Sequence, residues 1–153
     1  MGFLKGKTAI ITGGGRAVLS DGSCGSIGYG IATAYAKEGA NLVITGRNLQ
    51  KLEDAKEELE RLYGIQVLPV QADVNAGTDN EAAVANVVKQ AIDTFGRIDV
   101  LINNAQASAS GVSLIKKRFA GFKKIMNVRI HVNAVVIVST VKRHINLMHR
   151  ILQ

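Results

Sequence analysis

The amino-acid sequence predicts an α/β fold in which helices cover both faces of a parallel sheet. Two observations predict it. Short apolar runs rich in Val and Ile alternate with helical segments over the first hundred residues, and glycines stand where those helices should end. The 153 residues are 47% hydrophobic with a single Cys, which is typical of one globular domain without a disulfide framework.

The first expected unit is a strand followed by a helix. Residues 7–12 (KTAIIT) are apolar and β-branched and stop at Gly13, which is typical of a buried parallel strand. After a stretch rich in Gly and Ser, residues 27–38 form a helical segment whose small side chains allow close packing on a sheet. Gly39 is the expected end of this helix.

The second unit repeats the pattern. Residues 41–45 (NLVIT) form the second expected strand. Residues 49–63 follow as an amphipathic helix, because their leucines recur on one face, and Gly64 ends it. Residues 66–70 are the third expected strand.

The last unit begins with a helix-start signal. Residues 78–81 (TDNE) have the spacing of a capping box, and an apolar stripe follows as far as Phe95. Residues 98–102 (IDVLI) are the fourth strand, stopped by Asn103. Because such alternation builds right-handed β–α–β units, the sequence predicts a Rossmann-like doubly wound parallel sheet, truncated after about four strands.

Glycines follow the first strand, where such a sheet binds phosphates. Residues 12–16 (TGGGR) leave the strand, and residues 25–30 (GSIGYG) open the next helix. A glycine cluster by itself is typical of any flexible turn. After the first strand of a β–α–β unit it favours a dinucleotide site, since the backbone can approach a pyrophosphate that the helix N-terminus stabilises.

These motifs resemble the short-chain dehydrogenase/reductase family. Thr12-Gly13 and Ile27-Gly28 resemble the two ends of its glycine-rich loop, with residues 17–25 inserted and Ser26 in place of the middle glycine. The Ser-Ile pair is also similar to the enoyl-reductase branch of that superfamily.

Two later motifs follow in the family's order. Ala72-Asp73-Val74 resembles the segment with the adenine-contacting Asp, and Asn103-Asn104-Ala105 resembles the Asn-Asn-Ala-Gly motif, with Gln106 in place of Gly. The resemblance covers residues 3–114 and implies a nicotinamide dinucleotide cofactor. The residues expected to bind this cofactor are Thr12, Gly13, Arg16, Ser26, Ile27, Gly28, Arg47, Ala72, Asp73, Val74, Asn103, Asn104 and Ala105.

The charge at the end of the second strand favours NADP over NAD. An NAD site usually has a carboxylate there, whereas this strand is followed by Arg47. A guanidinium pairs well with a 2′-phosphate, and Arg16 stands where NADP-preferring relatives carry a second basic residue. NAD remains the alternative, since Asp21 of the inserted segment would weaken this preference.

No catalytic residue is predicted. The family's hydride chemistry needs a Tyr with a Lys four residues later, and an upstream Ser. Tyr29, Tyr35 and Tyr63 are followed at that spacing by Thr, Gly and Val. No metal site is predicted either, because no His, Cys or Glu pattern has ligand spacing.

The charge divides the chain in two. Residues 1–99 carry 10 Lys and Arg against 12 Asp and Glu, whereas residues 100–153 carry 9 Lys and Arg and no acid. We therefore expect an NAD(P)-binding region at 1–114 and an atypical basic tail at 115–153. The tail is either a degraded copy of the family's interface helix or a frame-shifted sequence. Nucleic-acid binding is disfavoured, because few aromatic side chains accompany the basic ones.

Together these features predict an NADP-dependent oxidoreductase acting on a small carbonyl or alcohol substrate, present as an incomplete chain without activity. The alternative is a non-catalytic nucleotide-binding or interaction module. The resemblance also implies a homo-oligomer. No run of 18 apolar residues and no secretory leader occur in the sequence, so it predicts a cytoplasmic protein outside the membrane.

Overall fold

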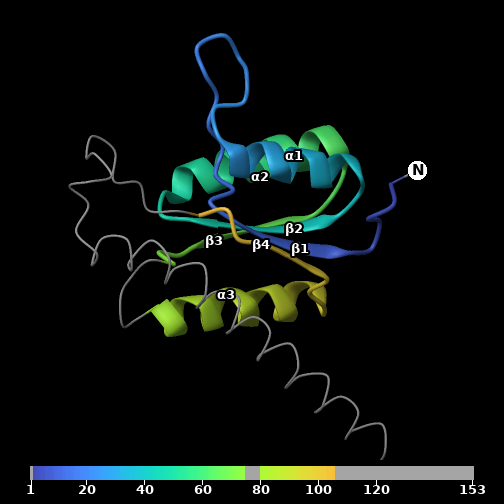
Figure 1. Cartoon of the computed structure of the whole chain (residues 1–153). Helices are drawn as coiled ribbons and strands as arrows, with labels where there is room; N and C mark the ends of the chain where they lie inside the picture. The colour runs from blue at the N-terminus through green and yellow to red at the C-terminus, as the bar shows by residue number, and fades with distance from the viewer. Residues whose placement is uncertain (1, 75–79, 106–153) are drawn as a thin grey trace, which may run out of the picture.

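The computed structural model describes residues 2–74 and 80–105, which form a four-stranded parallel sheet between two layers of helices (Figure 1). The predicted fold class is confirmed. In chain order the elements are β1 (Thr8–Thr12), α1 (Ile27–Lys37), β2 (Asn41–Gly46), α2 (Leu49–Tyr63), β3 (Val67–Gln71), α3 (Asn80–Phe95) and β4 (Val100–Ile102). The first half of the predicted capping box and the whole predicted tail lie outside the described residues.

The strand order is β3-β2-β1-β4, with every pair parallel. The chain builds the sheet outward from β1 through β2 to β3 and then returns to the other side of β1 for β4. The direction of winding therefore reverses between β1 and β4. In doubly wound sheets, ligands bind at the carboxyl ends of the strands beside such a reversal.

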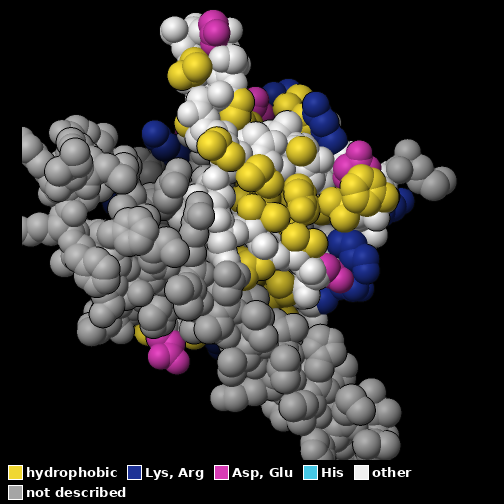
Figure 2. Space-filling view, viewed as in Figure 1, with side chains coloured by type: hydrophobic (Ala, Val, Ile, Leu, Met, Phe, Trp, Pro, Cys, Tyr) yellow, Lys and Arg dark blue, Asp and Glu magenta, His cyan; other side chains and the backbone are white. Residues whose placement is uncertain are grey.

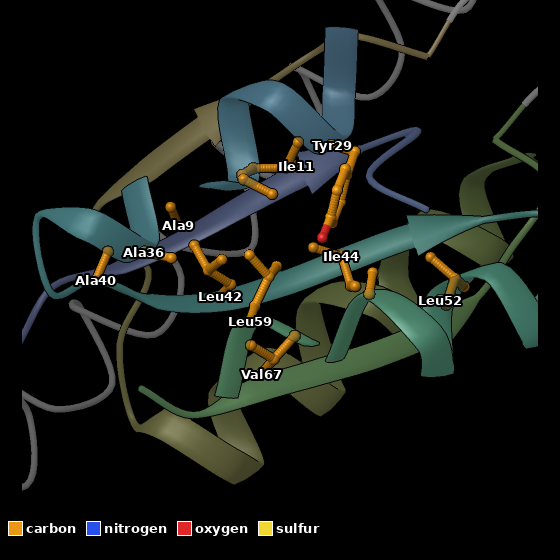
Figure 3. Packing of buried hydrophobic residues seen from close by; sticks show 12 residues of the cluster. Ala9, Ile11, Tyr29, Ala36, Ala40, Leu42, Ile44, Leu52, Leu59 and Val67 are labelled. Atoms are coloured by element: carbon orange, nitrogen blue, oxygen red, sulfur yellow. The ribbon is translucent and has the colours of Figure 1, made fainter. Parts of the chain in front are cut away.

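Alternate residues of the central strands face opposite helix layers. One cluster contains Ala9 and Ile11 of β1, Leu42 and Ile44 of β2, and the buried face of α1 and α2 (Figure 3). The residues between them in sequence, Ile10 and Val43, pack with side chains of α3 on the other face. Strands buried on both faces explain the continuous apolar runs that predicted a parallel sheet.

The helix boundaries follow the signals in the sequence. The Asn48 side chain accepts a hydrogen bond from the backbone N–H of Lys51 at 3.1 Å and so begins α2. Gly64 ends the same helix in the left-handed conformation, with φ +63°. Ser26 is the N-cap of α1, which ends at Lys37, one residue before the predicted end.

Strand β4 begins at Val100, two residues later than predicted. The side chain of Asp99, and not a backbone carbonyl, binds the neighbouring N–H of β1. Its carboxylate accepts a hydrogen bond from the backbone N–H of Thr8 at 2.9 Å, while its own N–H donates to the Thr8 carbonyl at 2.9 Å. Arg97 and Lys7 also bind this carboxylate, at 2.5 Å and 3.5 Å.

We expect Asp99 to make the stability of the fold depend on acid. Partial burial alone would raise the pKa of Asp99, but the bonds from Arg97 and from the Thr8 N–H, with the charge of Lys7, hold that pKa below its usual value. The stabilisation is therefore present above the unfolded-state pKa, about 3.9, and lost as the pH falls through the lower folded-state pKa.

The variant Asp99→Asn should accordingly cost about 1 kcal/mol at neutral pH, because its amide oxygen still accepts from the Thr8 N–H but without the charge that strengthens this bond. The ion pairs with exposed Lys7 and Arg97 add little, since they are screened. Urea unfolding of both proteins at pH 7 and near pH 3 measures the difference. A gap that stays constant between these pH values would contradict this role of the carboxylate.

The inserted segment forms a narrow hairpin that projects from the helix layer of α1 and α2 (Figure 1). Val18 and Cys24 form an antiparallel bridge, and the Gly25 N–H donates to the Ala17 carbonyl at 2.7 Å. At the tip, Asp21 accepts hydrogen bonds from the Ser23 backbone and hydroxyl at 2.9 and 2.6 Å.

Strand β4 forms an edge of the described sheet. Its side chains are only half-buried, whereas all five residues of β1 are buried. Figure 2 shows hydrophobic side chains across the middle of the face on which α1 and β4 lie in Figure 1.

Within the described residues, no helix combines the length and apolar character needed to cross a bilayer.

Candidate functional site

The side chain of Thr12, the last residue of β1, joins β1 to the end of β4. Its Oγ1 accepts hydrogen bonds from the backbone N–H groups of Asn104 and Ala105, at 3.0 and 2.9 Å, and donates to the Ile102 carbonyl at 3.4 Å. Thr12 is 3% exposed. Two of the predicted motifs therefore meet at one buried hydroxyl.

Gly13, Gly28 and Asn104 come together at the same point. The Asn104 Nδ2 donates to the carbonyls of Thr12 at 2.9 Å and Gly13 at 3.5 Å. A Cβ on Gly28 would lie 2.1 Å from the Gly13 oxygen and 2.5 Å from that Nδ2. Gly13 itself has φ +72°, which L side chains rarely adopt. The first turn of α1 thus lies directly against the end of β1, and only glycine fits.

The N-terminus of α1 opens at this contact. The Ser26 Oγ accepts from the Tyr29 N–H and donates to the Gly15 carbonyl, both at 3.4 Å. Ile27, the first residue of the helix, is 71% exposed. A helix N-terminus beside a glycine-rich turn attracts phosphate, and an exposed Ile at its mouth offers an apolar surface to a ligand.

The ends of β2 and β3 form the other side of the candidate site. The Arg47 carbonyl accepts from the Gln71 side chain at 2.9 Å, and the Gly46 carbonyl accepts from the Ala72 N–H at 3.0 Å. The Arg47 side chain is exposed beside the N-terminus of α2. Of the predicted Ala72-Asp73-Val74 segment, Val74 packs into the core, whereas Asp73 is exposed.

The side chain of Arg16 pairs with a carboxylate on α2. Its guanidinium Nε binds the Glu58 carboxylate, and the Tyr29 hydroxyl donates to the same carboxylate oxygen at 2.6 Å. The hydrogen bonds from Arg16 and Tyr29 lower the pKa of Glu58. Burial and the contact with Glu58 raise the pKa of Tyr29.

Sequence reasoning missed Glu58 and Tyr29 as partners of Arg16. One signal was present, because Glu58 lies between Ala55 and Leu59, at the border of the apolar face of α2. An acidic side chain at such a border is placed to reach a cation on a neighbouring element.

The remaining predicted residues lie at the same sheet edge. Asn103 and Ala105 follow β4 and are half-buried. In the described part of the chain, no group of three His, Cys, Asp or Glu side chains is placed to hold a metal ion. The arrangement is a glycine-lined helix start with a cation at the next strand, which suits an extended phosphate-bearing ligand.

The sequence is similar to those of known proteins. The sequence model of the short chain dehydrogenase family matches residues 7–151. A 12α-hydroxysteroid dehydrogenase from Clostridium sp. is 66% identical over 114 residues, which are 74% of this chain and 41% of that protein. A peroxisomal 2,4-dienoyl-CoA reductase from Danio rerio is 35% identical over 130 residues, covering 82% of this chain and 37% of the relative.

Solved structures are similar as well. The L-sorbose reductase of Gluconobacter frateurii, in complex with NADPH and L-sorbose, has a TM-score of 0.72 at 27% identity, covering 93% of this chain and 49% of that one. A short chain dehydrogenase from Burkholderia cenocepacia in complex with NADP has a TM-score of 0.71 at 28% identity, covering 91% and 51%. The chain thus spans well under half the length of the first curated relatives and about half of these solved chains.

Proposed function

Since this chain belongs to the short-chain dehydrogenase family, we propose that it forms the NADP-binding part of an oxidoreductase acting on a carbonyl/hydroxyl pair. The observation that carries the proposal is the contact of Gly13, Gly28 and Asn104. It brings the N-terminus of α1 to the carboxyl end of β1, beside the reversal of strand order.

The residues present fit a nicotinamide dinucleotide. A Cβ on Gly28 would collide with the Gly13 carbonyl, so this glycine lets the start of α1 pack closely on the turn after β1, as in a dinucleotide-binding unit. We assign the pyrophosphate to the turn at Thr12–Gly13 and the start of α1, with Ile27 against the ligand, and the adenosine end to Arg47 and the segment 72–74. The segment 103–105 lines the opposite end. When bound, the cofactor supplies or accepts a hydride.

The preference for NADP rests on Arg47. Its guanidinium is exposed at the carboxyl end of β2, and the segment 46–48 carries no acid. An arginine at that position favours a 2′-phosphate through paired charge-assisted hydrogen bonds. Similarity to solved relatives that hold NADPH or NADP supports the same choice.

The variant Arg47→Ala should weaken NADPH binding about tenfold and leave NADH binding nearly unchanged, because only NADPH has the 2′-phosphate. Fluorescence titration of both dinucleotides measures the two affinities. Lys37→Ala, which removes an exposed cation from the last turn of α1, is the matched control. Equal losses for NADPH and NADH would contradict the assignment of Arg47.

We also propose that the 153-residue chain binds the dinucleotide without turnover, because no Tyr in it has a Lys four residues later. We expect no change in NADPH absorbance above background with a hydroxysteroid and NADP. NADPH binding without turnover would also fit the alternative of a non-catalytic nucleotide-binding module. Turnover that is lost on replacing one residue of this chain would refute the proposal.

The substrate of the whole protein is proposed to be a hydroxysteroid or a similar alcohol, on the strength of 66% identity to the clostridial dehydrogenase.

The tail, 115–153, is proposed to be a degraded or frame-shifted interface helix, which leaves a homo-oligomer as a proposal for the whole protein. Reading the coding DNA around codons 105–160 in all three frames distinguishes the two origins, since a Tyr-x-x-x-Lys in another frame identifies a frameshift. The cytoplasmic location stays a prediction from the sequence.

A further inference from the structure

Two bonds hold Arg16 along α2. Its backbone N–H donates to the Lys51 carbonyl at 2.7 Å, which anchors the glycine-rich loop to the first turn of that helix. Its guanidinium then binds Glu58, seven residues further along. The side chain of Arg16 therefore runs from the start of α2 toward its C-terminal end.

The position of Glu58 sets the direction of this arginine. Glu58 lies ten residues after Asn48, the N-cap of α2, which is about 15 Å along the helix axis. Arg47, the cation assigned to the 2′-phosphate, directly precedes that N-cap. Glu58 thus draws the guanidinium of Arg16 away from the end of α2 where Arg47 stands.

The ion pair can exchange partners. The side chains of Arg16 and Glu58 are 36% and 26% exposed, and both line a hollow of about 200 Å³ between the inserted hairpin, α1 and α2. Exposed pairs of this kind contribute only about 0.2–1 kcal/mol. A phosphate monoester carries close to two negative charges at neutral pH, so it is a strong competitor for the same guanidinium.

We propose that Glu58 is a specificity-determining residue, because it competes with the 2′-phosphate of the dinucleotide for Arg16 and so weakens NADPH binding relative to NADH. The inference rests on the proposed function. Tyr29 supports the competition, since its hydroxyl donates to the same Glu58 oxygen at 2.6 Å and so keeps the carboxylate beside Arg16. Binding of NADPH requires Arg16 to leave Glu58, whereas binding of NADH does not.

The test compares NADPH and NADH in fluorescence titrations of the 153-residue chain, three single variants and one double variant. Glu58→Gln should strengthen NADPH binding about threefold, and Arg16→Met should weaken it by a similar factor, with NADH unchanged in both. The control Glu57→Gln removes the same charge from the neighbouring exposed residue and should change neither affinity. In the Arg16→Met background, Glu58→Gln should give no gain.

The outcomes separate the two proposals. Opposite shifts from Glu58→Gln and Arg16→Met, confined to NADPH, support the competition, because a general loss of folding cannot produce them. If the unaltered chain binds NADPH but Glu58→Gln leaves or lowers that affinity, the competition is refuted and the proposed function stands. If the unaltered chain binds neither dinucleotide, the proposed function fails.

Discussion

Replacing Gly28 with alanine is expected to destabilise the fold by about 3 kcal/mol and to reduce NADPH affinity by about tenfold or more. The added Cβ would lie 2.1 Å from the Gly13 carbonyl oxygen. That oxygen has little freedom to move, because the N–H groups of Gly13 and Gly14 are both bonded to the Thr45 carbonyl, at 2.6 and 3.2 Å. Relief requires α1 to move away from the end of β1.

The control for this variant lies two residues along in the same helix. A Cβ on Gly30 would meet only the Cys24 Sγ, at an ordinary 3.5 Å. Gly30→Ala should therefore be neutral or stabilising by about 0.5–1 kcal/mol, because alanine restricts the unfolded chain. Urea unfolding measures both variants. Similar losses from Gly28→Ala and Gly30→Ala would show that helix composition, and not the contact with Gly13, decides the effect.

The second large effect is expected for Thr12→Val, which should cost about 2 kcal/mol. Valine keeps the shape of threonine but leaves the Ala105 N–H without its acceptor, and an unmet group of this kind costs about 1–3 kcal/mol. The Asn104 N–H and the Ile102 carbonyl also lose the Thr12 hydroxyl but keep their bond to each other at 3.1 Å. Dinucleotide binding should weaken too, because the turn at residues 103–105 loses its backbone bonds to the Thr12 hydroxyl and keeps the bonds of the Asn104 side chain.

The neighbouring strand offers a matched control. Thr45 is the register partner of Thr12, is 1% exposed, and has an Oγ1 that finds no hydrogen-bond partner among the described residues. Thr45→Val should therefore stabilise the protein by about 1 kcal/mol, since it removes an unsatisfied buried hydroxyl. Thr12→Ser, which keeps the hydroxyl, should recover most of the loss. Equal effects at positions 12 and 45 would contradict this explanation.

The sequence predicts the fold well because the pattern is local. A strand buried on both faces must be apolar throughout, and an amphipathic helix must repeat its leucines, so residues 8–12 and 49–63 carry their own signal. The candidate site also follows, because parallel strands place all their carboxyl ends at one edge. Motifs after each strand must then lie together.

The sequence does not predict which side chains, far apart in the chain, form hydrogen bonds or ion pairs with each other. Arg16 and Glu58 are 42 residues apart, and no periodicity relates them. The same holds for the start of β4, where the Asp99 carboxylate reaches Thr8 across 91 residues. Local pattern sets which face a residue lies on, whereas the partner depends on the packing of α1 on α2 and of β4 on β1.

The bonds from Thr12 to Asn104 and Ala105 also bear on the order in which the protein forms during synthesis. The hydrogen-bond donors to the Thr12 hydroxyl lie 92 and 93 residues later in the chain. At about 5–20 residues per second, those partners leave the ribosome roughly 5–20 s after Thr12 does. Among the described segments, the glycine-rich turn is therefore made early, but its bonds to residues 104 and 105 form only after β4 has been made. During that interval β1 lacks the hydrogen bonds that the Thr12 hydroxyl makes in the folded protein.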